Sequence, residues 1–371
     1  MFTNTVIRTR KTLDKIQPYS PGKPIWELQL ELGLEGVIKM ASNENALGPS
    51  IKAVEAITRN VTQINRYPDA DAVRLKEMIA LNLNLRQEQL IITNGADELI
   101  TLISETFLEA GDEIVVPFPA FSEYEFGAHL MGGKVVHVAL GELFEYEVEP
   151  ILSVITNRTK IVYICSPNNP TGTYLPKKSL EHLLKSLPKN VLVVFDAAYW
   201  HYATAEDYTN GIEYITLNYP VIVLQTFSKI YGLAGVRVGF GAAREDIIQS
   251  ILKVKEPFNV NSLAQAAAVA AVMDDEHVNK SKKLNSQGRN QLYKAFSNMN
   301  LRYIESMSNF ILVKIGPEAE SFYNQLLLRG IIVRYGAIWG LPEYIRISLG
   351  TLEENRVLIK AMNSILNEVA W

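Results

Sequence analysis

One segment of the chain, residues 225–240, places an amine nucleophile close to groups that bind anions. Its lysine, Lys229, follows two hydroxyl side chains, Thr226 and Ser228, and precedes Arg237 by eight residues. A lysine amine can form an imine with an aldehyde, and hydroxyl and guanidinium groups together suit a phosphate. Most lysines, however, are solvated surface charges. The interpretation of Lys229 therefore depends on what the rest of the chain places beside it.

Two turns earlier in the chain offer further polar groups. Gly95, Ala96 and Asp97 open a predicted helix directly after the short apolar stretch 91–93. Free N–H groups and the positive dipole end of a helix suit a phosphate, although an ordinary strand–turn–helix connection explains the same residues. Asn169 lies in a proline-containing turn after the apolar run 161–165. Its amide could bind a ligand, but a plain turn is also consistent with this segment.

A carboxylate and a tyrosine follow another apolar run. Asp196 ends the run 191–195, and Tyr199 comes three residues later. Burying a carboxylate is unfavourable without a cationic partner, and a protonated pyridine nitrogen would be such a partner. A helix N-cap is the alternative. A phosphate seat, an amide, a carboxylate and a lysine thus follow four predicted strands in order, which indicates a pyridoxal phosphate site.

The apolar runs predict the elements that position these groups. They alternate with segments of helical spacing such as 96–110. Strands that are apolar throughout and alternate with helices indicate an α/β fold with a mainly parallel sheet covered on both faces. Such sheets bind ligands at the carboxyl ends of their strands. The predicted strands are 91–93, 113–116, 134–138, 161–165, 191–195 and 221–224.

The pattern changes after about residue 255. A long helical region reaches residue 294, and shorter strands and helices follow, which predicts a smaller α+β domain. These later elements are strands at 310–314, 331–334 and 344–348 and helices at about 318–329 and 352–369. We predict an N-terminal arm (1–30), a large cofactor-binding domain (31–260) and a small C-terminal domain (261–371).

The composition argues against several classes of protein. The 371 residues include 36 basic and 40 acidic side chains, so the net charge of −4 disfavours a nucleic-acid partner. The single cysteine, Cys165, excludes an internal disulfide and fits a reducing compartment. Neither a signal-peptide core nor a membrane-spanning apolar run is evident. The five histidines form no metal motif, and no GxGxxG dinucleotide motif is present. We therefore expect a cytoplasmic protein with no metal and no membrane partner.

Several segments resemble the fold-type I pyridoxal-phosphate aminotransferases of the aspartate aminotransferase superfamily. Within that superfamily the chain is most similar to the histidinol-phosphate aminotransferases, from about residue 15 to its end. The resemblance implies a seven-stranded, mainly parallel sheet between helices and pyridoxal 5'-phosphate as the cofactor. The matching segments are 17–19 (QPY), 41–45 (ASNEN), 47–49 (LGP), 66–69 (RYPD), 93–98 (TNGADE), 168–172 (NNPTG), 225–240 and 344–351 (YIRISLGT).

The resemblance implies roles for the cofactor-binding residues. Lys229 would form the imine and then act as general base, while Asp196 would pair with the pyridine nitrogen. Asn169 and Tyr199 would donate hydrogen bonds to the ring oxygen. Phe121 would stack on the ring, although it could also be an ordinary core phenylalanine. The residues implied to hold the phosphate are Gly95, Ala96, Asp97, Thr226, Ser228 and Arg237.

The resemblance also implies a partner and substrates. Tyr67 resembles the tyrosine that reaches the partner subunit's cofactor, so a homodimer with shared active sites is expected, although Tyr67 could be a plain surface aromatic. The implied reaction is a ping-pong transamination between histidinol phosphate and 2-oxoglutarate, or glutamate in reverse, in histidine biosynthesis. Two arginines suit a dianion better than one, but Arg334 could also belong to a surface ion pair. The implied substrate-binding residues are Tyr19, Asn43, Asn169, Arg334 and Arg346.

Two departures from the family pattern and three alternatives remain. Residues 196–199 read Asp-Ala-Ala-Tyr where the family has Asp-Glu-Ala-Tyr, and residues 43–46 end in alanine where the family has proline. The second departure loosens a turn near the predicted substrate site. An aromatic amino acid aminotransferase and a threonine-phosphate decarboxylase share the scaffold. A vitamin-binding regulator is disfavoured, because a match that starts near residue 15 leaves no room for a DNA-binding module.

Overall fold

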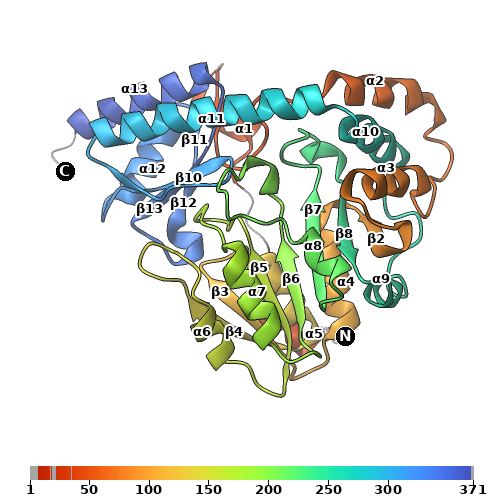
Figure 1. Cartoon of the computed structure of the whole chain (residues 1–371). Coiled ribbons are helices and arrows are strands. Elements are labelled where there is room, and N and C mark those ends of the chain that lie inside the picture. Colours follow the sequence, from red (N-terminus) through yellow and green to blue (C-terminus); the bar gives the residue numbers. More distant parts are fainter. Residues whose placement is uncertain (1–6, 17, 19–21, 35, 369–371) are drawn as a thin grey trace, which may run out of the picture.

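The structure is a computed structural model that describes residues 7–16, 18, 22–34 and 36–368. It contains a seven-stranded sheet between helices and a smaller four-stranded sheet that carries helices of its own (Figure 1). The predicted α/β fold, with a mainly parallel sheet followed by a smaller α+β part, is confirmed.

The large sheet has the strand order β2-β8-β7-β6-β5-β3-β4. All neighbouring strands are parallel except β8, which is antiparallel to both β2 and β7. The strands of this sheet are β2 (Leu90–Thr93), β3 (Glu113–Phe118), β4 (Lys134–Ala139), β5 (Thr159–Cys165), β6 (Leu192–Asp196), β7 (Val221–Thr226) and β8 (Gly239–Ala243).

Strand β8 was not predicted, because its sequence consists mostly of glycine and alanine. Close packing explains that composition. A Cβ atom on Gly239 would lie 2.8 Å from the backbone nitrogen of Ala96, and one on Gly241 would meet the Leu99 side chain. The glycines therefore let the helix that begins at residue 95 lie directly against the sheet.

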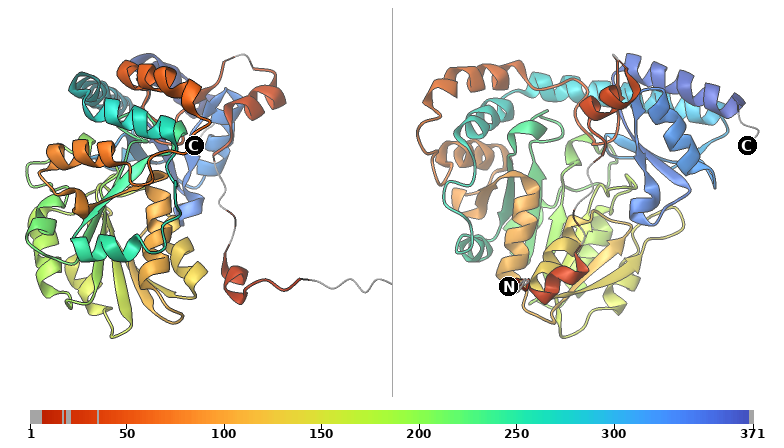
Figure 2. Two further views of the ribbon diagram at one scale, coloured as in Figure 1. Left: turned by 90° about the vertical axis from the view of Figure 1, so that its right-hand side faces the viewer. Right: turned by 180° about the vertical axis from the view of Figure 1, so that it is seen from behind.

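Helices cover both faces of the large sheet (Figure 2). The helices of the chain are α1 (Ile25–Leu32), α2 (Ile51–Asn60), α3 (Val73–Leu83), α4 (Gly95–Phe107), α5 (Glu123–Met131), α6 (Val148–Ser153), α7 (Lys177–Ser186), α8 (Ile212–Thr216), α9 (Glu245–Ile251), α10 (Ser262–Val272), α11 (Asp275–Asn298), α12 (Ala319–Leu328) and α13 (Leu352–Glu368). Short 3-10 helices are η1 (Lys11–Lys15), η2 (Val61–Gln63), η3 (Gln87–Gln89), η4 (Trp200–Tyr202), η5 (Ala234–Val236) and η6 (Gly336–Trp339).

Two hydrophobic cores, one on each face, hold the helices to the sheet. Alternate residues of a strand enter opposite cores, as the two-residue period of a strand requires. In β6, Val193 and Phe195 join the core beneath α3, α7 and α10, while Leu192 and Val194 join the core beneath α4, α5 and α9. Because both cores are apolar, the central strands are buried along their whole length.

The smaller part is built around an antiparallel sheet of order β12-β13-β10-β9. Its core also takes side chains from α11, α12 and α13. A separate two-stranded parallel pair joins β1 to β11. The strands are β1 (Ile38–Lys39), β9 (Arg302–Tyr303), β10 (Phe310–Lys314), β11 (Ile331–Ile332), β12 (Arg334–Tyr335) and β13 (Tyr344–Ser348).

The long helix α11 runs from the region of α2 and α10 to the smaller sheet (Figure 1). Its neighbour α10 packs against α2 and α3, on the side of the large sheet. Near the other end of the chain, η1 contacts α5, while Leu28 of α1 packs with Ala41 and Ile332. The division of the chain at residues 30 and 260 stays a prediction. Within the described part of the chain, no helix is long and apolar enough to cross a membrane.

Candidate active site

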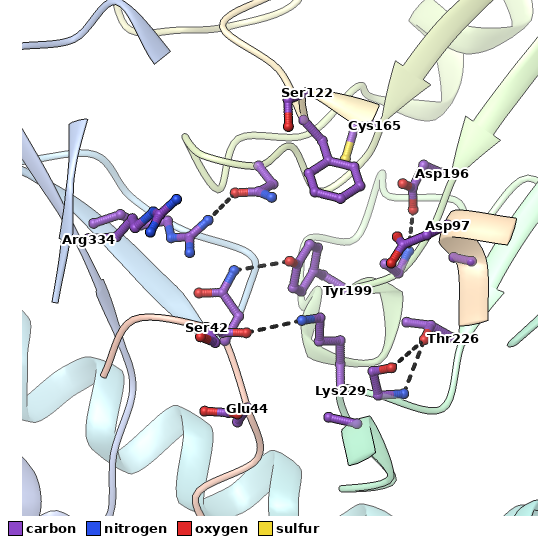
Figure 3. A pocket seen from close by; sticks show the side chains of 18 of the residues that line it. Ser42, Glu44, Asp97, Ser122, Cys165, Asp196, Tyr199, Thr226, Lys229 and Arg334 are labelled. Atoms are coloured by element: carbon purple, nitrogen blue, oxygen red, sulfur yellow. Dashed lines mark hydrogen bonds between the residues drawn. The ribbon is translucent and has the colours of Figure 1, made fainter. Parts of the chain in front are cut away.

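A cavity of about 280 Å³ lies where the carboxyl ends of β5, β6 and β7 face the smaller sheet (Figure 3). Segments far apart in the sequence line it. The lining residues that the sequence predicted are Asn43, Ala96, Asp97, Phe121, Asn169, Asp196, Tyr199, Thr226, Ser228, Lys229, Arg237, Arg334 and Arg346. The structure thus brings together the polar groups that follow the predicted strands.

Lys229 follows β7, and its amine points across the cavity (Figure 3). Its Nζ donates a hydrogen bond to the backbone oxygen of Ser42 at 3.2 Å and lies 5.7 Å from the centre of the Tyr199 ring. Burial, followed by the nearby Arg346 cation, lowers the pKa of Lys229 to about 8. A lysine with such a pKa is a better nucleophile and base near neutral pH than a surface lysine.

A cup of hydrogen-bond donors lies beside Lys229. Thr226 Oγ1 donates to Ser228 Oγ at 3.0 Å and accepts from the Ser228 N–H at 3.1 Å. Arg237 reaches the cup from a left-handed backbone position and donates to Ser228 Oγ at 3.4 Å and to Asp97 Oδ2 at 3.2 Å. The N-terminus of α4 adds backbone N–H groups on the same side. Hydroxyls, a guanidinium and a helix N-terminus together suit a phosphate.

Gly95, the first residue of α4, has the positive φ of 82° that favours glycine. A Cβ at this position would also collide with the guanidinium of Arg237. The glycine therefore gives Arg237 room beside the α4 N-terminus.

Asp196, the last residue of β6, presents a buried carboxylate to the cavity. It is 5% exposed, and burial raises its pKa. Its Oδ1 accepts from the Ala198 N–H at 3.0 Å, and its Oδ2 accepts from the Tyr124 hydroxyl at 2.7 Å. Sequence reasoning did not select Tyr124. The available signal was an aromatic residue three positions after Phe121.

Two amides and a tyrosine form a second polar layer. Asn43 Nδ2 donates to the Tyr199 hydroxyl at 3.0 Å, and Ser348 Oγ donates to Asn43 Oδ1 at 2.9 Å. Asn169 Oδ1 accepts a hydrogen bond from Arg346. This bond directs the acceptor side of the Asn169 amide toward the arginine, which leaves its amino group to face elsewhere.

Arg346 is held on the opposite wall of the cavity. Its guanidinium carbon lies 5.2 Å from the centre of the Phe310 ring and 4.8 Å from that of Trp339. One guanidinium nitrogen also donates to the backbone oxygen of Ala41 at 2.6 Å. Arg334 lies directly opposite Arg346 in the β12–β13 pair and lines the same cavity. Two cationic groups therefore lie side by side, which suits an anionic ligand.

Ile338 and Trp339, both in η6, add an apolar wall that sequence reasoning did not select. Ile338 is 55% exposed although it lines the cavity. No motif marks these two residues in the sequence, because they reach the cavity only through the way η6 places them near Arg346.

Three predicted residues need separate comment. Tyr67 does not line the cavity; it is 82% exposed and stacks on Phe258 with ring centres 4.7 Å apart. Tyr19 lies outside the described residues. Phe121 lines the cavity and meets the Tyr124 ring edge-on, with ring centres 5.8 Å apart.

Among the residues that the structure describes, no group of three histidine, cysteine or acidic side chains is arranged to hold a metal ion.

Comparison with known proteins agrees with this arrangement. The family model "Aminotransferase class I and II" matches residues 35–362. The chain is 47% identical to a histidinol-phosphate aminotransferase of Moorella thermoacetica over 98% of this chain and 94% of that protein. It is 42% identical to one of Caldicellulosiruptor saccharolyticus, over 96% and 99% of the two chains.

Solved structures show the same fold. Histidinol-phosphate aminotransferase from Sinorhizobium meliloti, in complex with pyridoxal-5'-phosphate, superposes with a TM-score of 0.91 at 25% identity, covering 99% of this chain and 100% of that one. A double mutant of Thermus thermophilus aspartate aminotransferase reaches 0.85 at 24% identity, over 98% and 100% of the two chains, and is similar in fold. The chain therefore belongs to the class I and II aminotransferases and, among them, to the family of the histidinol-phosphate aminotransferases.

Proposed function

We propose that this aminotransferase uses pyridoxal phosphate to move an amino group between histidinol phosphate and 2-oxoglutarate. The observation that carries the proposal is the arrangement of one cavity: an amine of lowered pKa, a buried carboxylate and an anion cup on one side, and two arginines on the other. The names of the relatives support the choice of substrate.

The residues present fit the proposed cofactor. The cup of Thr226, Ser228 and Arg237 offers donors for a phosphate, and Gly95 lets the Arg237 guanidinium lie beside the N-terminus of α4. The buried Asp196 carboxylate would gain the cationic partner that its burial demands from a protonated ring nitrogen. When bound, pyridoxal phosphate supplies an aldehyde that exchanges amino groups and a ring that withdraws electrons from the carbon carrying the nitrogen.

The chain's own residues would bind the substrates and move the proton. Lys229 Nζ would act as nucleophile and would then remove a proton from the substrate carbon and hold it for transfer to the second carbon that takes part in the amino-group exchange. With a pKa of about 8, roughly one Lys229 amine in ten is neutral at pH 7. With the ordinary lysine pKa of 10.5, almost none would be neutral. Arg346 and Arg334 would hold the phosphate of histidinol phosphate in one half-reaction and a carboxylate of glutamate in the other. Asn43 would orient the Tyr199 hydroxyl.

An absorbance titration tests the proposal. Purified protein loaded with pyridoxal phosphate should show a cofactor band that bleaches when histidinol phosphate is added and returns with 2-oxoglutarate. A response to phenylalanine or tyrosine alone would move the function to an aromatic amino acid aminotransferase, whose substrate ring could contact the apolar side chains of Ile338 and Trp339. Release of carbon dioxide from threonine phosphate would instead indicate the decarboxylase. Protein that takes up no cofactor would contradict the proposal as a whole.

We also propose that the protein is a cytoplasmic homodimer in which Tyr67 completes the partner's site. The exposed Tyr67–Phe258 stack supports this, because such an aromatic pair is unfavourable in water and suits an interface. Two inactive variants, Tyr67→Ala and Lys229→Ala, should regain up to about a quarter of the activity when they are unfolded and refolded together, since some mixed dimers then hold one intact site. Failure to regain activity, with mixed dimers present, would contradict shared sites.

A further inference from the structure

Tyr124 is a buried residue that the mechanism above does not use, yet it contacts two groups of the proposed cofactor site. It lies in the first turn of α5 and is 1% exposed. Its hydroxyl donates to Asp196 Oδ2 at 2.7 Å, and its ring meets Phe121 edge-on. The Tyr124 ring also stacks on the ring of Tyr163, in β5. The two ring centres are 4.5 Å apart and the angle between the ring planes is 17°. A rigid aromatic stack therefore fixes the position of the hydroxyl.

The direction of this hydrogen bond follows from the surroundings of the two groups. Burial, together with the neighbouring Asp196 charge, raises the pKa of Tyr124 well above its ordinary value, so the phenol keeps its proton. Burial also raises the pKa of Asp196, while the hydrogen bonds from Tyr124 and from the Ala198 N–H act in the opposite direction. The Tyr124 hydroxyl is thus a permanent donor that favours the ionised carboxylate.

We propose that Tyr124 is a positioning residue that acts on the cofactor through Asp196, by holding the carboxylate in the charge state and orientation that a protonated ring nitrogen requires. The inference rests on the proposed function, because it assumes that pyridoxal phosphate occupies the cavity. Tyr124 does not line the cavity, so its effect on a ligand is transmitted by the carboxylate. The other titratable groups that act on or respond to Asp196 are Asp97, Tyr146, Tyr163, Cys165, Tyr199, Tyr208 and Lys229.

A purely structural role for Tyr124 makes a different prediction from the proposed one. If the hydroxyl only filled the core, its loss would disturb every ligand of the cavity alike. If it acts through Asp196, its loss should affect only ligands that carry a basic ring nitrogen. A cofactor analogue in which a CH group replaces this nitrogen separates the two roles, because it keeps the aldehyde and the phosphate.

The test measures the affinity of cofactor-free protein for pyridoxal phosphate and for this analogue. The Tyr124→Phe variant should bind pyridoxal phosphate about tenfold more weakly, since it loses a hydrogen bond to a charged group, and should bind the analogue within about twofold of the original protein. Tyr163→Phe is the matched control. It also removes one hydroxyl from the stacked pair of rings, but the Tyr163 hydroxyl lies beside Ser104. This control should leave both affinities unchanged.

Several outcomes would overturn the inference. If Tyr124→Phe lowered the affinities for both ligands equally, its role would be structural. If it lowered neither affinity, Tyr124 would have no role in binding the cofactor. The original protein binding neither ligand would remove the proposed function first and the inference with it.

An Asp196→Asn background gives an independent measurement. No carboxylate is left there to act through, so adding Tyr124→Phe should change the affinity for pyridoxal phosphate by less than about twofold. A further tenfold loss in this background would also contradict the inference.

Discussion

The two sides of the cavity are held in place by different parts of the fold. On the side proposed for the cofactor, Asn169, Asp196 and Thr226 stand at or just after the ends of neighbouring strands of one sheet. On the side proposed for the substrate, Arg334 and Arg346 lie in the smaller sheet, and residues 41–44 approach them from the other end of the sequence. Asp196 is thus fixed by the pairing of neighbouring strands within one sheet, whereas Arg346 depends on how two sheets lie relative to each other.

This difference separates the expected effects of substitutions. A change on the cofactor side should impair cofactor binding or both half-reactions equally. A change on the substrate side should leave cofactor binding intact and alter the affinity for substrates. Four experiments test the separation, from the largest expected effect to the smallest.

Lys229→Ala should have the largest effect. Removing the proposed nucleophile and general base should lower the rates of both half-reactions by about 10⁴-fold. Single-turnover absorbance with each substrate measures this loss, and Lys178→Ala, which removes an exposed lysine far from the cavity, is the control. Residual rates within tenfold of the original would contradict the role of Lys229.

Arg346→Gln tests the substrate side. Arg346 is the proposed anion-binding residue and its guanidinium lies close to the Phe310 and Trp339 rings, so its loss should lower kcat/KM by about 100-fold for histidinol phosphate and for glutamate. The affinity for pyridoxal phosphate should change by less than about threefold. Steady-state kinetics and a cofactor titration measure the two quantities, and a cofactor affinity that fell as far as kcat/KM would break the separation.

Lys229→Met tests a link between the two sides, since Arg346 helps to lower the pKa of Lys229. Between pH 10.5 and about 8 the unfolded chain takes up a proton at Lys229 and the folded chain does not, so this lysine reduces stability as the pH falls, and the full reduction is present below pH 8. Met should therefore stabilise the cofactor-free protein by about 2 kcal/mol at pH 7 and by much less above pH 10.5.

Denaturant unfolding at the two pH values measures this gain. In the Arg346→Gln background the gain at pH 7 should be smaller, because one of the groups that disfavour the lysine charge is then absent. An equal gain at both pH values would show that the charge on Lys229 is not the cause.

Ile338→Ala should have the smallest effect. Ile338 is half exposed at the mouth of the cavity, so its loss should raise KM for histidinol phosphate by about twofold to threefold and leave KM for glutamate unchanged. Leu143→Ala, which shortens an exposed apolar residue away from the cavity, is the control. An equal rise for both substrates would argue against a role for Ile338 in recognising the larger one.

The cofactor side was also the easier one to predict from the sequence. Asp196 and Lys229 follow unbroken apolar runs, and a parallel sheet places the ends of such strands together. β8 was missed, because packing against α4 requires glycine where a strand normally shows β-branched residues. Tyr124 and Trp339 were missed as well, since their roles arise from contacts across the fold that no local pattern records. The role proposed for Tyr67 depends on a second chain.

The short parallel pair of β1 and β11 has a consequence for protein engineering. Ile38 and Lys39 pair with Ile331 and Ile332, so one residue separates the pair from residues 41–44 on one strand and from Arg334 on the other. The two segments that form the substrate side are therefore linked by backbone hydrogen bonds just outside the cavity. A chimera that exchanges residues 331–348 with those of a relative of different specificity should fold and discriminate substrates well only when residues 36–46 are taken from the same parent.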